Sequence, residues 1–268
     1  MTTLELQRDV AKSASDQALY FDMLAEMGHT KHIGGLAATM RLMELIEPRK
    51  ADYILDVGCG VGIAPVFLAQ QYSCRVVGVD ITPRMLDRAR ERAARKGVTE
   101  LTDFRLADMH ALPFDDGHFD AVIAESVICF SSEKEAVLAE MIRVVKPGGH
   151  VAFTEATWRM PPPPDMARLM THALGLPEGM LAHEAWRAVL ESSELEQLVA
   201  EEYPITVREE ARNQYHRIDI SDYLRTFGRF LKVLVNPAYR AIYREALSSQ
   251  PATYYNYVGY GVYGGVRP

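Results

Sequence analysis

The stretch LDVGCGVG, from Leu55 to Gly62, is the most informative part of the chain for its fold. It joins the apolar run YILDV (53–57) to the helical pattern VGIAPVFLAQQ, so its three glycines lie at a turn from strand to helix. Glycine lets the backbone approach a nucleoside-bearing cofactor, because a Cβ atom would collide with it. The turn therefore predicts a cofactor site at the end of a buried strand.

Strands and helices alternate around this turn. The predicted strands are 53–57, 74–80, 102–108, 119–126 and 150–156. Thr82 and Pro83 mark a helix start, because threonine suits the N-cap and proline has no N–H to lose at the first helical position. Ser132 and Glu135 are predicted to form a capping box. Such alternation implies right-handed crossovers and a parallel sheet with helices on both faces.

The pattern becomes less regular after Trp158. The other predicted elements are helices at 4–27, 34–47, 165–175, 183–200 and 219–249, and a sixth strand at 198–207. The final run TYYNYVGYGVYGGV alternates tyrosine with small residues and predicts an edge or hairpin strand. We therefore expect an α/β, Rossmann-like fold: a seven-stranded, mostly parallel sheet with helices on both faces, plus helical N-terminal and C-terminal cover segments.

The expected organisation has three parts. Residues 1–49 form a helical N-terminal cover, residues 50–158 the cofactor-binding core, and residues 159–268 the rest of the sheet with a helical substrate-cover insertion at about 205–250. In this insertion an apolar stripe of Tyr223, Phe227, Phe230, Leu231 and Leu234 lies opposite a basic stripe of Arg225, Arg229 and Lys232. We expect the apolar stripe to face inward; a packed helix with a solvated basic face is the alternative.

Composition restricts the class of protein. The 268 residues carry a net charge of -7, which argues against nucleic-acid binding, because phosphate neutralisation needs clustered Lys and Arg. Residues 205–268 are locally basic, with nine Lys or Arg against five Asp or Glu, so peripheral membrane contact stays an alternative to a solvated face. We expect a cytoplasmic protein, because the three cysteines form no Cys-x-x-Cys pair and the charged N-terminus does not resemble a signal peptide. We expect no transmembrane segment, because no apolar stretch is long enough to cross a bilayer. The oligomeric state is open.

Two acidic residues follow the glycine turn at informative positions. Asp80 ends the second strand, 18 residues after Gly62, where a carboxylate accepts hydrogen bonds from ribose hydroxyls. Asp108 ends the third strand, where a carboxylate suits an adenine amino group. Because the carboxyl ends of parallel strands share one edge of the sheet, we expect all three features to meet.

These segments have a family resemblance. LDVGCGVG, VVGVDITPRML, ADMHALPFDDGHFDAV and RVVKPGG resemble successive motifs of class I S-adenosylmethionine-dependent methyltransferases, of the ubiquinone/menaquinone-biosynthesis and sterol methyltransferase type. The resemblance covers roughly residues 50–157. It implies S-adenosyl-L-methionine as cofactor, bound by Asp56, Gly58, Gly60, Gly62, Asp80, Ile81, Met85, Asp108, Met109 and Glu125.

Glu125, at the end of the fourth strand, is the candidate catalytic residue. Methyl transfer from a sulfonium is an in-line displacement, so a general base is needed only where the acceptor must lose a proton. A contact from Glu125 to the cofactor's amino group or to backbone is an equal alternative. The predicted substrate pocket comprises Tyr20, His29, His32, Cys129, Glu155, Trp158 and Phe227. No metal is expected, since the His-x-x-His pair lacks the glutamate of a zinc-protease motif.

The partner is expected to be a small-molecule methyl acceptor, apolar or lipid-like, of the quinone or prenyl type. A small amine methylated on nitrogen is the alternative acceptor, and an S-adenosylmethionine-binding scaffold is the non-enzymatic alternative. An NAD-dependent dehydrogenase is disfavoured because the dinucleotide fingerprint would need a glycine where Ile63 stands.

Overall fold

Buried apolar strands form the centre of the structure, a computed structural model. β1 (Tyr53–Val57) pairs in parallel with β2 (Arg75–Asp80) on one side and with β4 (Phe119–Glu125) on the other. Their sequences are rich in Val, Ile, Leu and Ala because helices cover both faces of a parallel sheet. The further strands are β3 (Thr102–Leu106), β5 (Val145–Trp158), β6 (Glu196–Pro204) and β7 (Val258–Val266). The structure describes residues 18–28, 32–210, 212, 225, 228–230, 233–248 and 253–268, without the side chains of 172–174 and 245–248.

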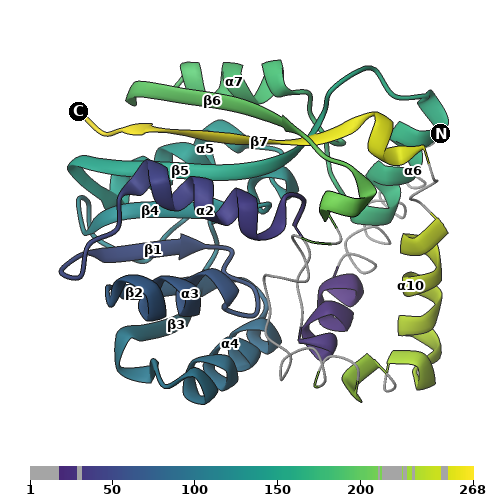
Figure 1. Ribbon diagram of the computed structural model, residues 1–268, viewed down its shortest axis with the longest axis horizontal. Coiled ribbons are helices and arrows are strands. Elements are labelled where there is room, and N and C mark those ends of the chain that lie inside the picture. The colour runs from purple at the N-terminus through teal and green to yellow at the C-terminus, as the bar shows by residue number, and fades with distance from the viewer. Residues whose placement is uncertain are drawn as a thin grey trace.

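The strands follow the order β3-β2-β1-β4-β5-β7-β6 (Figure 1). β7 runs antiparallel to both β5 and β6, whereas the pairs among β1 to β5 are parallel. This confirms the predicted seven-stranded, mostly parallel, Rossmann-like sheet. From β1 the chain proceeds to β2 and β3 on one side and returns to β4 and β5 on the other. Such a reversal opens a crevice at the carboxyl ends of the strands.

Helices cover the two faces of the sheet, since alternate residues of a strand point to opposite faces. Ile54 packs with α2 (Gly35–Ile46) and α3 (Ile63–Tyr72), whereas Leu55 packs with α5 (Lys134–Val144) and α7 (His183–Glu191). α4 (Pro83–Lys96) packs beside α3 and on β3. Further described helices are α6 (Pro164–Leu174), α10 (Pro237–Ser248), residues 18–27, helical residues at 207–210, 228–230 and 233–235, and the short 3₁₀ segments η1 (Thr99–Leu101), η2 (Ile128–Phe130) and η3 (Tyr254–Asn256). Over the described part of the chain, no helix has both the length and the apolar character to cross a bilayer.

Two cover segments meet beyond the carboxyl ends of the parallel strands (Figure 1). Met23, in the helix at 18–27, packs in one buried cluster with Val233 and with Tyr239 of α10. α4 anchors this cluster, because Arg84 Nη1 donates to the hydroxyl of Tyr239 at 3.1 Å. The division into a core and two helical covers stays a prediction.

The insertion differs in part from its predicted stripes. Phe230 packs edge-on against Tyr243 of α10, with ring centres 5.2 Å apart, and Leu234 is exposed. Arg229 Nη2 donates to the carboxylate of Glu91 in α4 at 2.8 Å instead of remaining in solvent. Tyr223, Phe227, Leu231 and Lys232 lie outside the described residues. The inward orientation is therefore wrong for Leu234 and stays a prediction for the undescribed part.

Several boundaries near the end of the chain differ from the predicted ones. The predicted helix 183–200 ends at Glu191, and the sixth strand already begins at Glu196. The last strand lies between β5 and β6 and is not an edge. Its glycines allow this close pairing: an added Cβ at Gly259 would lie 2.4 Å from the carbonyl oxygen of Tyr203. The alternation of tyrosine and glycine thus belongs to a strand paired on both sides.

The start of α5 also differs. The predicted capping box of Ser132 and Glu135 is wrong, since the N-cap position is Glu133 and makes no side-chain capping bond. Instead, the hydroxyl of Ser131 accepts the N–H of Glu133 at 2.8 Å.

The close approach of α4 to the glycine turn yields a stability prediction. Gly62 and Gly97 both have left-handed φ values, +74° and +69°, but only at Gly62 would a Cβ meet protein atoms, 2.7 Å from Ala89 Cβ. We expect Gly97→Ala to lower the free energy of unfolding by about 1–2 kcal/mol, the cost of the left-handed conformation. Gly62→Ala should lower it by roughly 1–3 kcal/mol more, because α4 must shift. Denaturant unfolding measures both variants, and equal losses would show that α4 does not constrain the turn.

Candidate functional site

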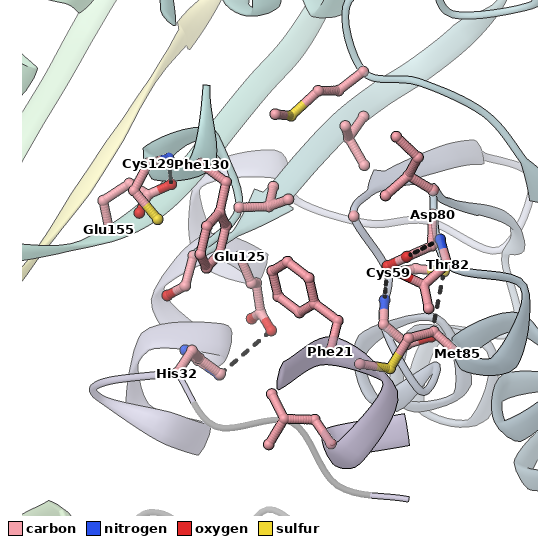
Figure 2. Close-up of a pocket in the computed structure, with 18 of the residues that line it drawn as sticks. Phe21, His32, Cys59, Asp80, Thr82, Met85, Glu125, Cys129, Phe130 and Glu155 are labelled. Carbon is pink, nitrogen blue, oxygen red and sulfur yellow. Dashed lines mark hydrogen bonds and ion pairs between the residues drawn. The ribbon is translucent and has the colours of Figure 1, made fainter. Parts of the chain in front are cut away.

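A pocket opens at the carboxyl ends of the strands, where the strand order reverses between β1 and β4. Its volume is about 380 Å³, within the range of about 300–1,000 Å³ for small-molecule sites. One half lies over β1, β2 and β3 and includes Asp80, Thr82 and Met85 (Figure 2). The other half lies over β4, β5 and the start of β7 and includes Cys129 and Glu155.

Asp80 holds the glycine turn in place. Its Oδ2 accepts the N–H of Gly60 at 2.9 Å, and its Oδ1 accepts the N–H of Thr82 at 2.8 Å (Figure 2). Thr82 occupies the predicted N-cap position of α4, but its own side chain makes no capping bond. Burial raises the pKa of the Asp80 carboxyl, and the two N–H bonds oppose part of that increase. The carboxylate thus joins the end of β2 to the turn after β1 while it lines the cavity.

The three glycines of the turn have different neighbours. Gly58 and Gly60 line the cavity, as predicted. An added Cβ at Gly58 would lie 2.3 Å from Cγ2 of Val127, so the loop after β4 requires this glycine as well. Gly62 is not among the lining residues and packs against Ala89 of α4 instead. The structure therefore gives Gly62 a packing role in place of the predicted cofactor contact.

Asp108 begins a chain of hydrogen bonds that crosses the cavity rim. Its Oδ1 accepts the N–H of His110 at 2.9 Å and lies 2.7 Å from His110 Nδ1. These bonds from His110 lower the pKa of the Asp108 carboxyl. His110 Nε2 lies 2.8 Å from the hydroxyl of Ser131, at the end of η2. Because Ser131 is buried, this Asp–His–Ser chain braces the loop after β3 and exposes no nucleophile.

Glu125, the last residue of β4, is held by two side chains that precede β1. Thr39 Oγ1 donates to Oε1 at 2.5 Å. His32 Nε2 lies 3.4 Å from Oε2 (Figure 2). The next residue, Ser126, has a φ of +53°, a left-handed conformation that is uncommon outside glycine. Its N–H donates to the carbonyl of Thr154 in β5 at 2.8 Å. Strain of this kind clusters at ligand sites, where the surrounding structure maintains it.

Glu155 approaches the cavity from the other face of the sheet. Glu125 pairs in register with Thr154, so the next residue, Glu155, points to the opposite face. Its Oε1 accepts the N–H of Cys129 at 3.2 Å, whereas its buried Oε2 has no hydrogen-bond partner among the described residues. Burial raises the pKa of Glu155 to about 7, although Cys129 and the backbone of Ile128 and Val127 oppose the increase.

The half of the cavity around Cys129 is largely apolar. The apolar and aromatic lining residues that belong to the same cluster as Cys129 include Ile33, Phe130, Leu176, Met180, Tyr254 and Tyr255. Phe21 and Phe130 meet edge-on with ring centres 5.0 Å apart, which joins the helix at 18–27 to η2. The carboxylates that line the whole cavity are those of Asp56, Asp80, Asp108, Glu125 and Glu155. None of the described lining residues is Lys or Arg.

Most predicted site residues converge on this cavity. Those that line it are Asp56, Gly58, Gly60, Asp80, Ile81, Met85, Asp108, Met109, Glu125, Tyr20, His32, Cys129 and Glu155. Trp158 does not: it is buried in an apolar cluster with Met166 and Met170, because β5 continues past the cavity. The predicted pocket residues His29 and Phe227 lie outside the described residues.

The sequence did not identify several residues of the site. Thr39, which anchors Glu125, sits in an ordinary amphipathic helix and carries no motif. His110 lies two residues after Asp108, and this spacing could have indicated that His110 donates to the Asp108 carboxylate. Phe21 and Phe130 come from segments far apart in the chain, so only the fold brings their rings together.

Comparison with known proteins identifies a matching family. Residues 55–153 match a family model described as a methyltransferase domain. The methyltransferase GfsG of Streptomyces halstedii is 33% identical over 138 residues, which are 52% of this chain and 47% of GfsG. Phosphoethanolamine N-methyltransferase 1 of Arabidopsis thaliana is 30% identical over 122 residues, 46% of this chain and 24% of that protein. The matches thus span half or less of these relatives' own length.

A solved structure extends the likeness over nearly the whole chain. The crystal structure of the [4+2]-cyclase SpnF aligns with 94% of this chain and 93% of its own, with a TM-score of 0.74 and 21% sequence identity. At this identity the likeness shows a shared fold that extends beyond residues 55–153.

The raised pKa of Glu155 makes stability depend on pH. A carboxyl whose pKa rises from 4.5 to about 7 binds its proton more tightly in the folded than in the unfolded chain. Its stabilising contribution is complete below pH 4.5 and is lost as the pH rises through about 7. We therefore expect the unfolding free energy of the wild type to fall, relative to Glu155→Gln, by up to roughly 3 kcal/mol over this window. Denaturant titrations at a series of pH values measure the difference, and a constant difference would contradict this assignment.

Proposed function

We propose that this chain, in which residues 55–153 form a methyltransferase domain of the class I type, binds S-adenosyl-L-methionine and transfers its methyl group to a small molecule. One observation supports the proposal most strongly. The glycine turn, Asp80, Asp108 and Glu125 follow the ends of four different strands, and all of them line one cavity. Each of the three carboxylates is held by hydrogen bonds or an ion pair within the protein. Such preorganisation is what an in-line displacement needs from its enzyme.

The charge of the cavity supports this cofactor. Its lining includes five carboxylates and, among the described residues, no Lys or Arg. S-adenosylmethionine carries a sulfonium and an ammonium group, which carboxylates attract, whereas they repel the diphosphate of NAD. When bound, the cofactor supplies an activated methyl group. We infer that Asp80 accepts a hydrogen bond from the ribose and that Asp108, with the Met109 backbone, contacts the adenine edge.

The apolar half of the cavity supports an acceptor with an apolar body. Phe130, Tyr254 and Tyr255 present aromatic surface there, which suits a quinone or prenyl-type molecule. A phosphorylated acceptor, as in the name of the Arabidopsis thaliana relative, is less favoured, because the described lining offers no cation to pair with phosphate. We therefore place a neutral, apolar acceptor first.

A small amine is the second candidate acceptor. Two observations favour it: Glu125 and Glu155 bring negative charge to the second half of the cavity, and aromatic rings lie beside them. Carboxylates and aromatic faces both attract cations. A substrate ammonium group would still have to lose a proton before methylation.

A cofactor-binding protein without methyl transfer is the competing class of function. SpnF shares the fold over nearly its whole length and is named a cyclase, so the fold does not decide the reaction. Methyl transfer to any acceptor distinguishes the two classes.

Glu125 is proposed to orient the reacting groups and stabilise positive charge beside the methyl donor. Thr39 donates to one of its oxygens and His32 lies 3.4 Å from the other, so the carboxylate is held at the wall of the cavity. A carboxylate held in this way stabilises the transition state through its charge and its position. Such electrostatic stabilisation is the largest contribution to rate enhancement in many active sites.

The cofactor assignment predicts a selective loss of affinity. Calorimetry should show binding of S-adenosylhomocysteine and none of NAD. Asp80→Asn should weaken S-adenosylhomocysteine binding by about 1.5–3 kcal/mol, the usual loss for a hydrogen bond to a charged group. Asp87→Asn, on the exposed face of α4, is the matched control and should bind normally. Normal binding by a folded Asp80→Asn protein would remove Asp80 from the site.

The reaction is tested with labelled S-adenosylmethionine and a panel of prenylated hydroquinones and small amines. The wild type should transfer label to at least one class. Glu125→Gln keeps the shape of the side chain but removes its charge, so turnover should fall at least about tenfold, or about 1.4 kcal/mol. S-adenosylhomocysteine affinity should change much less, and exposed Glu135→Gln should leave both quantities unchanged. Turnover by Glu125→Gln at the wild-type rate would return Glu125 to a purely structural role.

A further inference from the structure

A second carboxylate lines the cavity without a role in holding the cofactor. Glu155 lies with Cys129 on the side of the cavity away from Asp80 (Figure 2). Its Oε1 accepts the Cys129 N–H, whereas Oε2 is buried with no hydrogen-bond partner among the described residues. An unpaired buried oxygen is costly and rare, so one at a cavity wall indicates a ligand that pairs with it.

The titratable groups packed around Glu155 do not neutralise it. From β7, the hydroxyl of Tyr263 lies 3.0 Å from Nδ1 of His183. From α5, Lys134 Nζ pairs with the carboxylate of Glu178. Neither group donates to Glu155 in the described structure.

Cys129, on η2, is a third titratable neighbour of Glu155. Burial raises the pKa of its thiol well above the ordinary value, so the thiol stays uncharged. Cys129 therefore helps to hold the carboxylate without supplying a charge that would neutralise it.

We propose that Glu155 is the general base of the reaction, and that its Oε2 accepts the proton of the acceptor's hydroxyl or amine group as that group is methylated. The lone pair of the acceptor's oxygen or nitrogen forms the new bond to the methyl carbon. The bond from that carbon to the cofactor's sulfur breaks, and its electron pair remains on sulfur. The proton passes to the Glu155 carboxylate and from there to solvent. The inference rests on the proposed methyl transfer.

Glu155 suits this role better than Glu125. Thr39 donates to one oxygen of Glu125 and His32 lies 3.4 Å from the other, whereas the buried Oε2 of Glu155 has no hydrogen-bond partner among the described residues. Burial also raises the pKa of Glu155 to about 7, where a base can take up and release a proton near neutral pH.

The inference narrows the class of acceptor. Its reactive atom must carry a proton, as in a phenol, a quinol, or a primary or secondary amine. Its body must suit the apolar wall that includes Phe130, Leu176 and Met180. A molecule methylated on an atom without a proton would not need Glu155.

The test compares the wild type, Glu155→Gln and the exposed control Glu135→Gln, with labelled S-adenosylmethionine and a prenylated hydroquinone or an arylalkylamine as probe. Wild-type kcat/KM should rise with pH through about 7, since the base must be ionised to act. Glu155→Gln should reduce kcat/KM at high pH by about 10²–10⁴-fold and abolish this rise. S-adenosylhomocysteine should bind Glu155→Gln as it binds the wild type, because Glu155 lies outside the cofactor half.

The outcomes separate the two proposals. A wild type that binds S-adenosylhomocysteine but methylates no probe contradicts the proposed function, and this inference with it. Wild-type methylation that Glu155→Gln leaves unchanged contradicts this inference alone. If Glu155→Gln does not fold, the wild-type profile decides, because a kcat/KM that is flat on both sides of pH 7 overturns the role of Glu155.

Discussion

The Asp80 carboxylate is the constraint on which the rest of the site depends. By accepting the N–H groups of Gly60 and Thr82, it fixes the turn after β1 against the start of α4. Gly62 lets the same turn pack directly on Ala89 of α4. With turn and helix in place, the carboxyl ends of β1 and β2 form one rigid wall of the cavity. Burial of Asp80 disfavours its charged form, and backbone N–H bonds offset part of that cost.

The alternation of side chains along β4 and β5 explains why the other half of the cavity has two unlike carboxylates. Glu125 faces α2 and is held by Thr39, whereas Glu155 faces the opposite side of the sheet and contacts Cys129. The first is fixed by its partners, and the second keeps an unpaired oxygen at a ligand-sized cavity. One strand register thus produces an orienting group and a proton acceptor in the proposed reaction.

The elements of the core could be predicted because they depend on residues that are close in sequence. The site residues that the sequence did not identify depend on contacts that form only in the folded protein. The strand at 53–57, the turn from strand to helix at the glycines, and the position of Asp80 at the end of the second strand were predicted correctly because each depends on neighbours close in the chain. Trp158 was misplaced because its environment depends on how far β5 extends, and Gly62 because its neighbour comes from α4. Thr39 had no signal at all, since its partner Glu125 is brought near only by the fold.

A crystal structure of the complex with S-adenosylhomocysteine tests the central claim most directly. The ribose hydroxyls should lie within hydrogen-bond distance of Asp80 and the adenine beside Asp108 and Met109. The sulfur should lie where the two halves of the cavity meet, on the Asp80 side of Glu125, with Glu155 free to contact an acceptor beyond it. S-adenosylhomocysteine bound elsewhere, or with its adenine against Phe130 and Met180, would contradict the assignment of the two halves.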